Sequence, residues 1–321
     1  MAVTIQAEAG HVALRDVFGA EILRIGERDS RVMMLDADLA SSTRTAKFAE
    51  RWPERAINVG IAEQNMTGIA AGLALAGYVP FVNTFASFLS RRACDQVAMS
   101  VAYPRLNVKF FGFHGGINLG EDGATQQAVE DIAIMSAIPG IRIYSPVDGH
   151  DLARTMNEVL AVDGPTYVRL ARFPSPLFTP RPDDREHAAS LITMREGDAA
   201  IVVTTGTLAA KVAEAADVLA AGGVRLKVVG VTRLKPLSKE LCALIASEPR
   251  RPVAVVEEHS MHGGLADLLS CELDRRGIAH LIHRIGIDDR FGESGHPQKL
   301  LEAFGLAGAP LCQRLRSIAG C

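Results

Sequence analysis

Residues 56–83 read AINVGIAEQNMTGIAAGLALAGYVPFVN, and this stretch determines the expected fold of the chain. A β-branched run ends at Val59, a glycine turn follows, and a long uncharged segment leads to a second such run, Val79–Asn83. The middle segment predicts a buried helix over Ala62–Ala76, and the flanking runs predict two strands. Apolar strands joined through helices are typical of a parallel sheet with helices on both faces.

The same stretch is apolar enough to be weighed as a membrane span. From Gln64 to Ser90 there is no Asp, Glu, Lys, Arg or His, and this length would cross a bilayer. Gly77 and Pro80 interrupt it, however, and it contains several polar side chains. We therefore favour a buried helix followed by a buried strand over a membrane segment.

The alternation of strand and helix continues along the whole chain and defines two domains. Strands are predicted at Val32–Leu35, Ala56–Val59, Val79–Asn83, Val108–Phe113, Arg142–Tyr144 and Thr166–Leu170, with helices at Val12–Arg28, Ala62–Ala76, Ser87–Ala102 and Gly149–Val162. After a proline-rich linker at Phe173–His187 the strands restart at Ala199–Thr205, Arg225–Val231, Val253–Glu257 and His280–Ile285. We expect an α/β protein with two doubly wound domains, residues 1–180 with a mostly parallel sheet and residues 190–321.

Composition excludes several classes of function. The 321 residues are 48% hydrophobic and 22% charged, as in a soluble globular protein with a large core. A formal net charge of −3 offers no basic surface for nucleic acid or an anionic membrane. The five cysteines contain no C-x-x-C pair, which argues against a disulfide framework or a zinc site and for a reducing cytoplasm.

Three polar or aromatic side chains follow strands of the first predicted domain. Glu63, Phe85 and His114 come after the second, third and fourth predicted strands. In doubly wound sheets ligands lie beyond the carboxyl ends of the strands, so these residues predict a binding site. Glu63 opens an otherwise uncharged segment, where a carboxyl would be poorly solvated and its pKa raised. The alternative is an acid that favours the first turn of a helix.

A second stretch, His114-Gly-Gly-Ile-Asn-Leu-Gly-Glu-Asp-Gly-Ala-Thr-Gln-Gln127, is dense in glycine and polar residues. Together with the Gly60–Glu63 turn, this string resembles the pyrimidine-binding half of transketolase, and the resemblance extends from about Arg15 to Leu306. It implies the thiamine diphosphate fold, with a transketolase C-terminal-like second domain. Glu63 would contact the pyrimidine ring nitrogen of thiamine diphosphate and help to activate the cofactor. Phe85 and Phe88 would pack around the aminopyrimidine, although aromatic residues more commonly fill a core.

The resemblance also implies a substrate site. His114 would face the phosphate end of a sugar phosphate, and Asp122 would hydrogen-bond a sugar hydroxyl near the reacting carbon. Arg15, Ser42 and Arg172 fall where transketolases hold the phosphate, and arginine suits this because its planar fork binds phosphate oxygens in pairs. Taken singly, each of these residues is more commonly a surface arginine or a helix cap. A sulfonate, which is similarly anionic, is an alternative to phosphate.

Three positions depart from the family pattern. Gln126 stands where most transketolases have His, Gly115 where they have an acid, and Arg91 where many have an aromatic residue. Gln126 can still hydrogen-bond a sugar hydroxyl, but it cannot become a cation. These differences suggest a changed substrate preference and a changed wall of the pyrimidine pocket.

The chain has no Gly-Asp-Gly…Asn segment to hold Mg²⁺ and the diphosphate. The resemblance therefore implies an N-terminal partner subunit that holds both, in a heterotetramer built around a dimer of this chain. The expected reaction is transfer of a two-carbon ketol unit from a ketose phosphate to an aldose acceptor. The alternatives are a 2-oxoacid dehydrogenase β subunit, a deoxyxylulose phosphate synthase-like protein, or a non-catalytic scaffold.

Two further clusters carry weaker signals. Residues 257–262 contain Glu and His side chains, but without H-E-x-x-H spacing, and we expect no metal site there. Gly206 and Thr207 could bind an anion at a helix start, although a plain turn is the commoner case.

Overall fold

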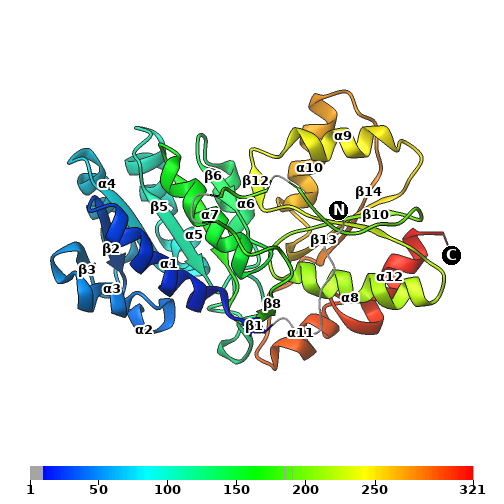
Figure 1. Ribbon diagram of the computed structural model, residues 1–321, viewed down its shortest axis with the longest axis horizontal. Coiled ribbons are helices and arrows are strands. Elements are labelled where there is room, and N and C mark those ends of the chain that lie inside the picture. The colour runs from blue at the N-terminus through cyan, green and yellow to red at the C-terminus, as the bar shows by residue number, and fades with distance from the viewer. Residues whose placement is uncertain (1–9, 184–185, 190, 321) are drawn as a thin grey trace.

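Two open sheets covered by helices make up the molecule, and the computed structural model describes residues 10–183, 186–189 and 191–320 (Figure 1). The first sheet has the strand order β12-β6-β7-β5-β4-β2-β3. Its strands are β2 (Val32–Asp36), β3 (Ala56–Asn58), β4 (Val79–Phe85), β5 (Lys109–Phe113), β6 (Arg142–Tyr144), β7 (Thr166–Leu170) and β12 (Arg233–Lys235). Among the described residues every pairing in it is parallel except that of β12 with β6. The predicted mostly parallel sheet is confirmed.

Helices cover both faces of this sheet because its strands are apolar on both sides. On one face α1 (Leu14–Arg28) and α7 (Gly149–Ala161) pack against Phe111 and Phe113, whereas Phe110 points to the other face. That other face carries α4 (Glu63–Leu75), α5 (Ala86–Arg92) and α6 (Asp131–Ala137). The connection from β2 to β3 contains α2 (Ala40–Thr43), α3 (Ala46–Arg51) and the 3₁₀ turn η1 (Pro53–Arg55).

The second sheet, β14-β13-β10-β11-β9, is also mostly parallel. Its strands are β9 (Ile192–Arg195), β10 (Ile201–Thr204), β11 (Lys227–Gly230), β13 (Val253–Ser260) and β14 (Ile282–Ile287). Helices α8 (Leu208–Ala221), α11 (Pro297–Ala303) and α12 (Gly308–Ile318) cover one face, and α9 (Lys239–Ser247) and α10 (Leu265–Arg275) the other. A short ribbon, β1 (His11–Val12) with β8 (Ser175–Pro176), lies between the two halves (Figure 1).

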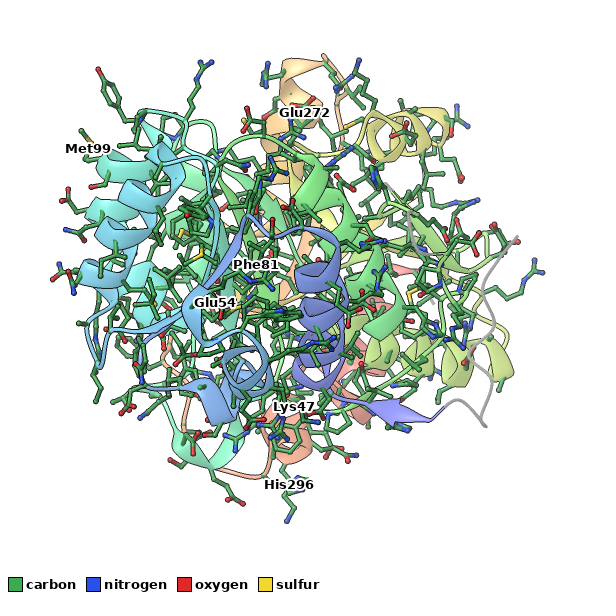
Figure 2. The ribbon with its side chains drawn as sticks, turned by 60° about the vertical axis from the view of Figure 1, so that its left-hand side comes forward. Lys47, Glu54, Phe81, Met99, Glu272 and His296 are labelled. Atoms are coloured by element: carbon green, nitrogen blue, oxygen red, sulfur yellow. The ribbon has the colours of Figure 1, made fainter. Side chains whose placement is uncertain are left out.

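The two halves share one hydrophobic core. Met66 and Phe110 of the first half belong to the same buried cluster as Val255 and Leu269 of the second. In addition, β12 comes from the C-terminal half but joins the edge of the first sheet, which the sequence analysis did not predict. The halves are therefore docked through side chains and through a backbone ladder. Figure 2 shows Phe81 among the packed side chains, where it is fully buried, and Met99 at the outer margin.

The helix predicted over Ser87–Ala102 is wrong in one respect, because it is divided. Helix α5 ends at Arg92, and a π-helical segment, η2 (Gln96–Ala102), follows. Leu89, Ala93, Val97 and Val101 recur every four residues and are all fully buried. That spacing drifts off one face of a 3.6-residue helix, and the wider π turn returns the later residues to the core. Within the described residues no helix is long and apolar enough to cross a membrane.

Candidate functional site

The predicted site residues gather at the carboxyl edge of the first sheet. Phe85 is the last residue of β4, and His114 directly follows β5. Glu63 begins α4, the helix that comes after β3, and Arg172 lies two residues beyond β7. Since these strands run parallel, their carboxyl ends meet at one edge and bring the four side chains to the same region.

Glu63 is buried at the N-terminus of α4, where its side chain is only 3% exposed. The sequence analysis did not predict its partner, Arg92 at the end of α5, which pairs with it. Arg92 Nη1 donates to Glu63 Oε1 at 3.1 Å and to Oε2 at 3.3 Å. The arginine itself is half exposed, so the pair lies at the mouth of the site. The positive end of the helix dipole also favours a negative charge at this position.

A row of flat side chains leads away from this pair. The Arg92 guanidinium lies 4.1 Å from the centre of the Phe88 ring, and Phe88 stacks on Phe85 at 5.3 Å between centroids. Phe85 in turn contacts His114, with ring centroids 4.3 Å apart. The hydroxyl of Ser87 fixes this row to the glycine-rich loop by donating to Gln126 O at 2.9 Å. These side chains (Arg92, Phe88, Phe85 and His114) form one continuous surface, which we call the aromatic shelf. It runs from the carboxylate of Glu63 to the imidazole of His114.

His114 occupies a strained and desolvated position. Its φ of +62° lies in the left-handed region, which is uncommon for a residue with a side chain. Its side chain is buried, and within the described residues neither ring nitrogen has a hydrogen-bond partner. Burial, then the charges of Arg172 and Arg15, lower its pKa from the usual 6.5 to about 3. A buried imidazole held in this way is poised to bind a polar ligand.

We expect the His114 ring to stay neutral between pH 5 and pH 8 in the chain without substrate. Its C–H signal in a proton NMR titration should not move over this range, and His114→Asn identifies the signal. Because the unfolded histidine takes up a proton near pH 6.5, the stability of the fold should decrease as the pH falls from about 6.5 towards 3. A signal that titrates near pH 6.5 would contradict the buried position.

Beyond His114 lie positively charged groups. Arg15 on α1 is half-buried, and within the described residues its buried Nε has no partner. Burial, then the charges of Arg44 and Arg172, lower the pKa of Arg15 against the opposing charge of Asp16, which pairs with Arg44. Arg172 Nη1 pairs with Asp122 at 2.7 Å, and both side chains are partly exposed. This cluster favours an anionic ligand.

The remaining predicted residues lie on α2 and on the glycine-rich loop. Ser42 is half-buried on α2, which packs against α1, and its N–H donates to Leu39 O at 2.8 Å. Gln126 contacts the Thr125 hydroxyl through its side chain. Asp122 lies in a short 3₁₀ turn, η3 (Gly120–Asp122). The roles predicted for these residues stay predictions.

Two departures from the family pattern have a local explanation. A Cβ at Gly115 would lie 2.6 Å from Arg169 Nε, so the acid that most transketolases carry there does not fit. Arg91 does not face the aromatic row; it forms an ion pair with Glu130 and donates to Gln127 O at 3.1 Å. Arg91 therefore holds the glycine-rich loop rather than lining the shelf, and Gly115 leaves room for the buried Arg169 side chain.

The acids and histidine at residues 257–259 are occupied by other contacts. Glu257 accepts hydrogen bonds from the Leu265 and Ala266 backbones, and His259 Nδ1 contacts Ser260 O at 2.8 Å. Among the described residues no group of three His, Cys, Asp or Glu side chains could hold a metal ion.

This fold and site define a thiamine diphosphate-type enzyme domain, and comparison with known proteins identifies the family. The model of the transketolase pyrimidine binding domain matches residues 10–174, and that of the transketolase C-terminal domain matches residues 190–309. The chain belongs to the transketolase family, whose members use thiamine diphosphate.

Its relatives include proteins of the same length. The chain is 36% identical over 306 residues to a putative transketolase C-terminal section of Methanocaldococcus jannaschii, covering 94% of this chain and 95% of that one. It is 37% identical over 305 residues to the 6-deoxy-6-sulfo-D-fructose transketolase subunit SqwH of Clostridium sp., covering 95% and 94%. A solved split-gene transketolase, described as an inactive β4 tetramer, matches with a TM-score of 0.84 and 33% identity over 97% of this chain and 99% of that one. The chain is also 33% identical to the 1-deoxy-D-xylulose-5-phosphate synthase of Heliobacterium modesticaldum, spanning 98% of itself but 48% of that enzyme.

Proposed function

We propose that this chain is the C-terminal subunit of a two-chain transketolase. In this proposal it transfers a two-carbon ketol unit from a ketose phosphate to an aldose acceptor, with thiamine diphosphate and Mg²⁺. The observation that carries the proposal is the aromatic shelf, which has the buried carboxylate of Glu63 at one end and Arg15 and Arg172 at the other. Such a shelf suits a flat heterocycle next to an anionic sugar.

An N-terminal partner subunit would hold Mg²⁺ and the diphosphate, in a cytoplasmic heterotetramer built around a dimer of this chain. Relatives named as a C-terminal section and as a subunit support this arrangement. So does the solved split-gene relative, since its tetramer of β chains is described as inactive. We assign residues 1–180 to the pyrimidine-binding domain and residues 190–321 to the C-terminal-like domain; of these, residues 1–9, 190 and 321 lie outside the described part of the chain.

The described residues fit the pyrimidine half of thiamine diphosphate. The planar guanidinium of Arg92 already lies over Phe88 and against Glu63, where a flat ring with a hydrogen-bonding nitrogen could replace it. Arg92 is half exposed, so its guanidinium can move into solvent, and the ring nitrogen would then take over the hydrogen bond to the buried Glu63 carboxyl. The two unpartnered nitrogens of His114 supply polar contacts at the other end of the shelf.

Each residue then has a definite task. Glu63 would hydrogen-bond the pyrimidine ring nitrogen and exchange a proton there, while Phe85 and Phe88 would hold the ring flat. Neutral His114 hydrogen-bonds the substrate, Asp122 and Gln126 bind sugar hydroxyls, and Arg15, Ser42 and Arg172 bind the phosphate. Thiamine diphosphate, when bound, supplies the chemistry that cleaves the bond between C2 and C3 of the donor sugar.

The test is ketol transfer from xylulose 5-phosphate to ribose 5-phosphate with thiamine diphosphate and Mg²⁺. We expect no turnover by this chain alone or by the product of a neighbouring gene encoding an N-terminal section alone, and turnover by the mixture. Activity of this chain by itself would contradict the proposal. A second donor, 6-deoxy-6-sulfo-D-fructose, tests whether the arginines accept a sulfonate, as the relationship to SqwH suggests.

The same mixture separates the rival functions. A deoxyxylulose phosphate synthase would release CO₂ from pyruvate in the presence of glyceraldehyde 3-phosphate, and a 2-oxoacid dehydrogenase subunit would decarboxylate a 2-oxoacid without any sugar. Failure of the mixture to bind thiamine diphosphate in calorimetry would favour the non-catalytic scaffold. The cationic cluster beside His114 favours a phosphorylated sugar, because a simple 2-oxoacid has no phosphate group for Arg15 and Arg172 to bind.

A further inference from the structure

The glycine-rich loop rests on a buried acid that comes from the other half of the chain. Glu258 lies on β13 of the second sheet, with 4% of its surface exposed. Its Oε1 accepts a hydrogen bond from the backbone N–H of Asn118 at 2.6 Å. This contact joins residues 140 positions apart and reaches from the second half into the substrate loop.

The fit between this carboxylate and the loop is close. Gly116 has a φ of +86°, and a Cβ there would lie 2.4 Å from Glu258 Oε1. At Gly115 a Cβ would meet Arg169, as described above. Side chains at either glycine would separate the loop from the acid, so the glycines permit the hydrogen bond to form.

A second hydrogen bond connects the loop to the segment that contains Arg172. Asn118 Oδ1 accepts a hydrogen bond from the backbone N–H of Phe173 at 3.1 Å. Phe173 follows Arg172, whose guanidinium pairs with Asp122 at the far end of the same loop. An unbroken path therefore runs from Glu258 through Asn118 to Arg172.

The buried side chain of Arg169 holds the backbone of Glu258. It donates to the Glu258 backbone oxygen at 2.9 Å and to Ala128 O at 3.1 Å, and its Nε binds Asp131 at 2.9 Å. Burial raises the pKa of Glu258 to about 7, against the lowering effects of Arg169 and of hydrogen bonds from the loop backbone. Burying an ionisable acid costs free energy, and the hydrogen bond to the loop gives a reason for an acid at this position.

We propose that Glu258 is a positioning residue, through which the C-terminal-like domain holds the substrate loop and Arg172 in their binding geometry. This assigns that domain a part in substrate binding, although it contributes no side chain to the shelf described above. The kinetic consequence rests on the proposed function, whereas the hold on the loop can be measured in the isolated chain.

The test compares Glu258→Gln with Glu257→Gln. The two acids are adjacent and both buried, but Glu257 binds the first turn of α10 instead of the loop. In hydrogen exchange of the full chain at pH 8, where the Glu258 carboxyl is ionised, Glu258→Gln keeps an acceptor oxygen but loses the charge that strengthens the hydrogen bond from Asn118. Exchange of the amides of residues 115–118 should therefore become about tenfold faster. Glu257→Gln should instead loosen the Leu265 and Ala266 amides.

In the two-chain enzyme, Glu258→Gln should raise KM for the phosphorylated donor by about tenfold, with thiamine diphosphate affinity unchanged. Asn118→Ala, which keeps the backbone N–H that binds Glu258 but breaks the link to Phe173, should also raise KM. Its exchange at residues 115–118 should match that of the natural chain.

Unchanged exchange at residues 115–118 in a folded Glu258→Gln chain would overturn the proposal. So would an equal rise in KM for Glu257→Gln, because the effect would then be general loss of stability. If the natural two-chain enzyme shows no ketol transfer, the proposed function has failed, and the exchange comparison still decides whether Glu258 holds the loop.

Discussion

Replacing Glu63 by glutamine should lower the kcat of the two-chain enzyme by about 10³-fold, within the range typical of lost proton transfer. Glutamine has nearly the same size and can still hydrogen-bond a ring nitrogen, but it cannot exchange a proton at that position. The side chain is buried at the start of α4, so water cannot easily replace the carboxyl. The fold should be retained, because the amide remains able to accept a hydrogen bond from Arg92.

The measurement is kcat and KM for ketol transfer, together with calorimetric binding of thiamine diphosphate. Binding should weaken far less than kcat falls, since Phe85 and Phe88 still hold the ring. Arg92→Met is the matched control, because it removes the other member of the ion pair while leaving the carboxyl in place. We expect it to keep most of the activity and to bind the cofactor at least as tightly. A Glu63→Gln enzyme with more than about one tenth of the natural kcat would falsify the assignment of Glu63 as a proton-exchanging residue.

The position of the site could be predicted from the sequence, because it follows from strand order. Continuous apolar runs indicated parallel strands, and residues that follow such strands must meet at one edge. Glu63, Phe85 and His114 do meet there. The desolvation of Glu63 was also predictable, since it opens a segment without charges.

Partners brought together by packing between elements could not be predicted in the same way. Arg92 pairs with Glu63 only because α4 and α5 lie side by side. The contact of Arg92 with Phe88 is different, because the two are four residues apart on one helix, a spacing at which side chains meet. Strand β12 contains three residues, too few for a periodic pattern. Glu258 reaches the loop from a strand of the other sheet, and no local pattern marks such a contact.

Arg172→Ala should raise KM for a phosphorylated donor by about 10²-fold and KM for its unphosphorylated analogue by much less. A hydrogen bond from arginine to a charged oxygen contributes about 1.5–3 kcal/mol, and the planar fork can make two. Without substrate, Arg172 pairs with Asp122, but both side chains are partly exposed. Such a pair is worth about 0–1 kcal/mol, so a phosphate can displace Asp122 at little cost.

Two variants make this test specific. Arg172→Lys keeps the charge but loses the fork, so it should recover only part of the affinity. Arg31→Ala removes an arginine from another exposed ion pair, with Asp29, and should leave both KM values unchanged. If the arginines recognise a tetrahedral anion, the KM for a sulfonate-terminated donor should rise in Arg172→Ala as the KM for the phosphate does. Equal effects on charged and uncharged donors would show instead that Arg172 acts through its bond to Asp122, by holding the loop that binds the sugar hydroxyls.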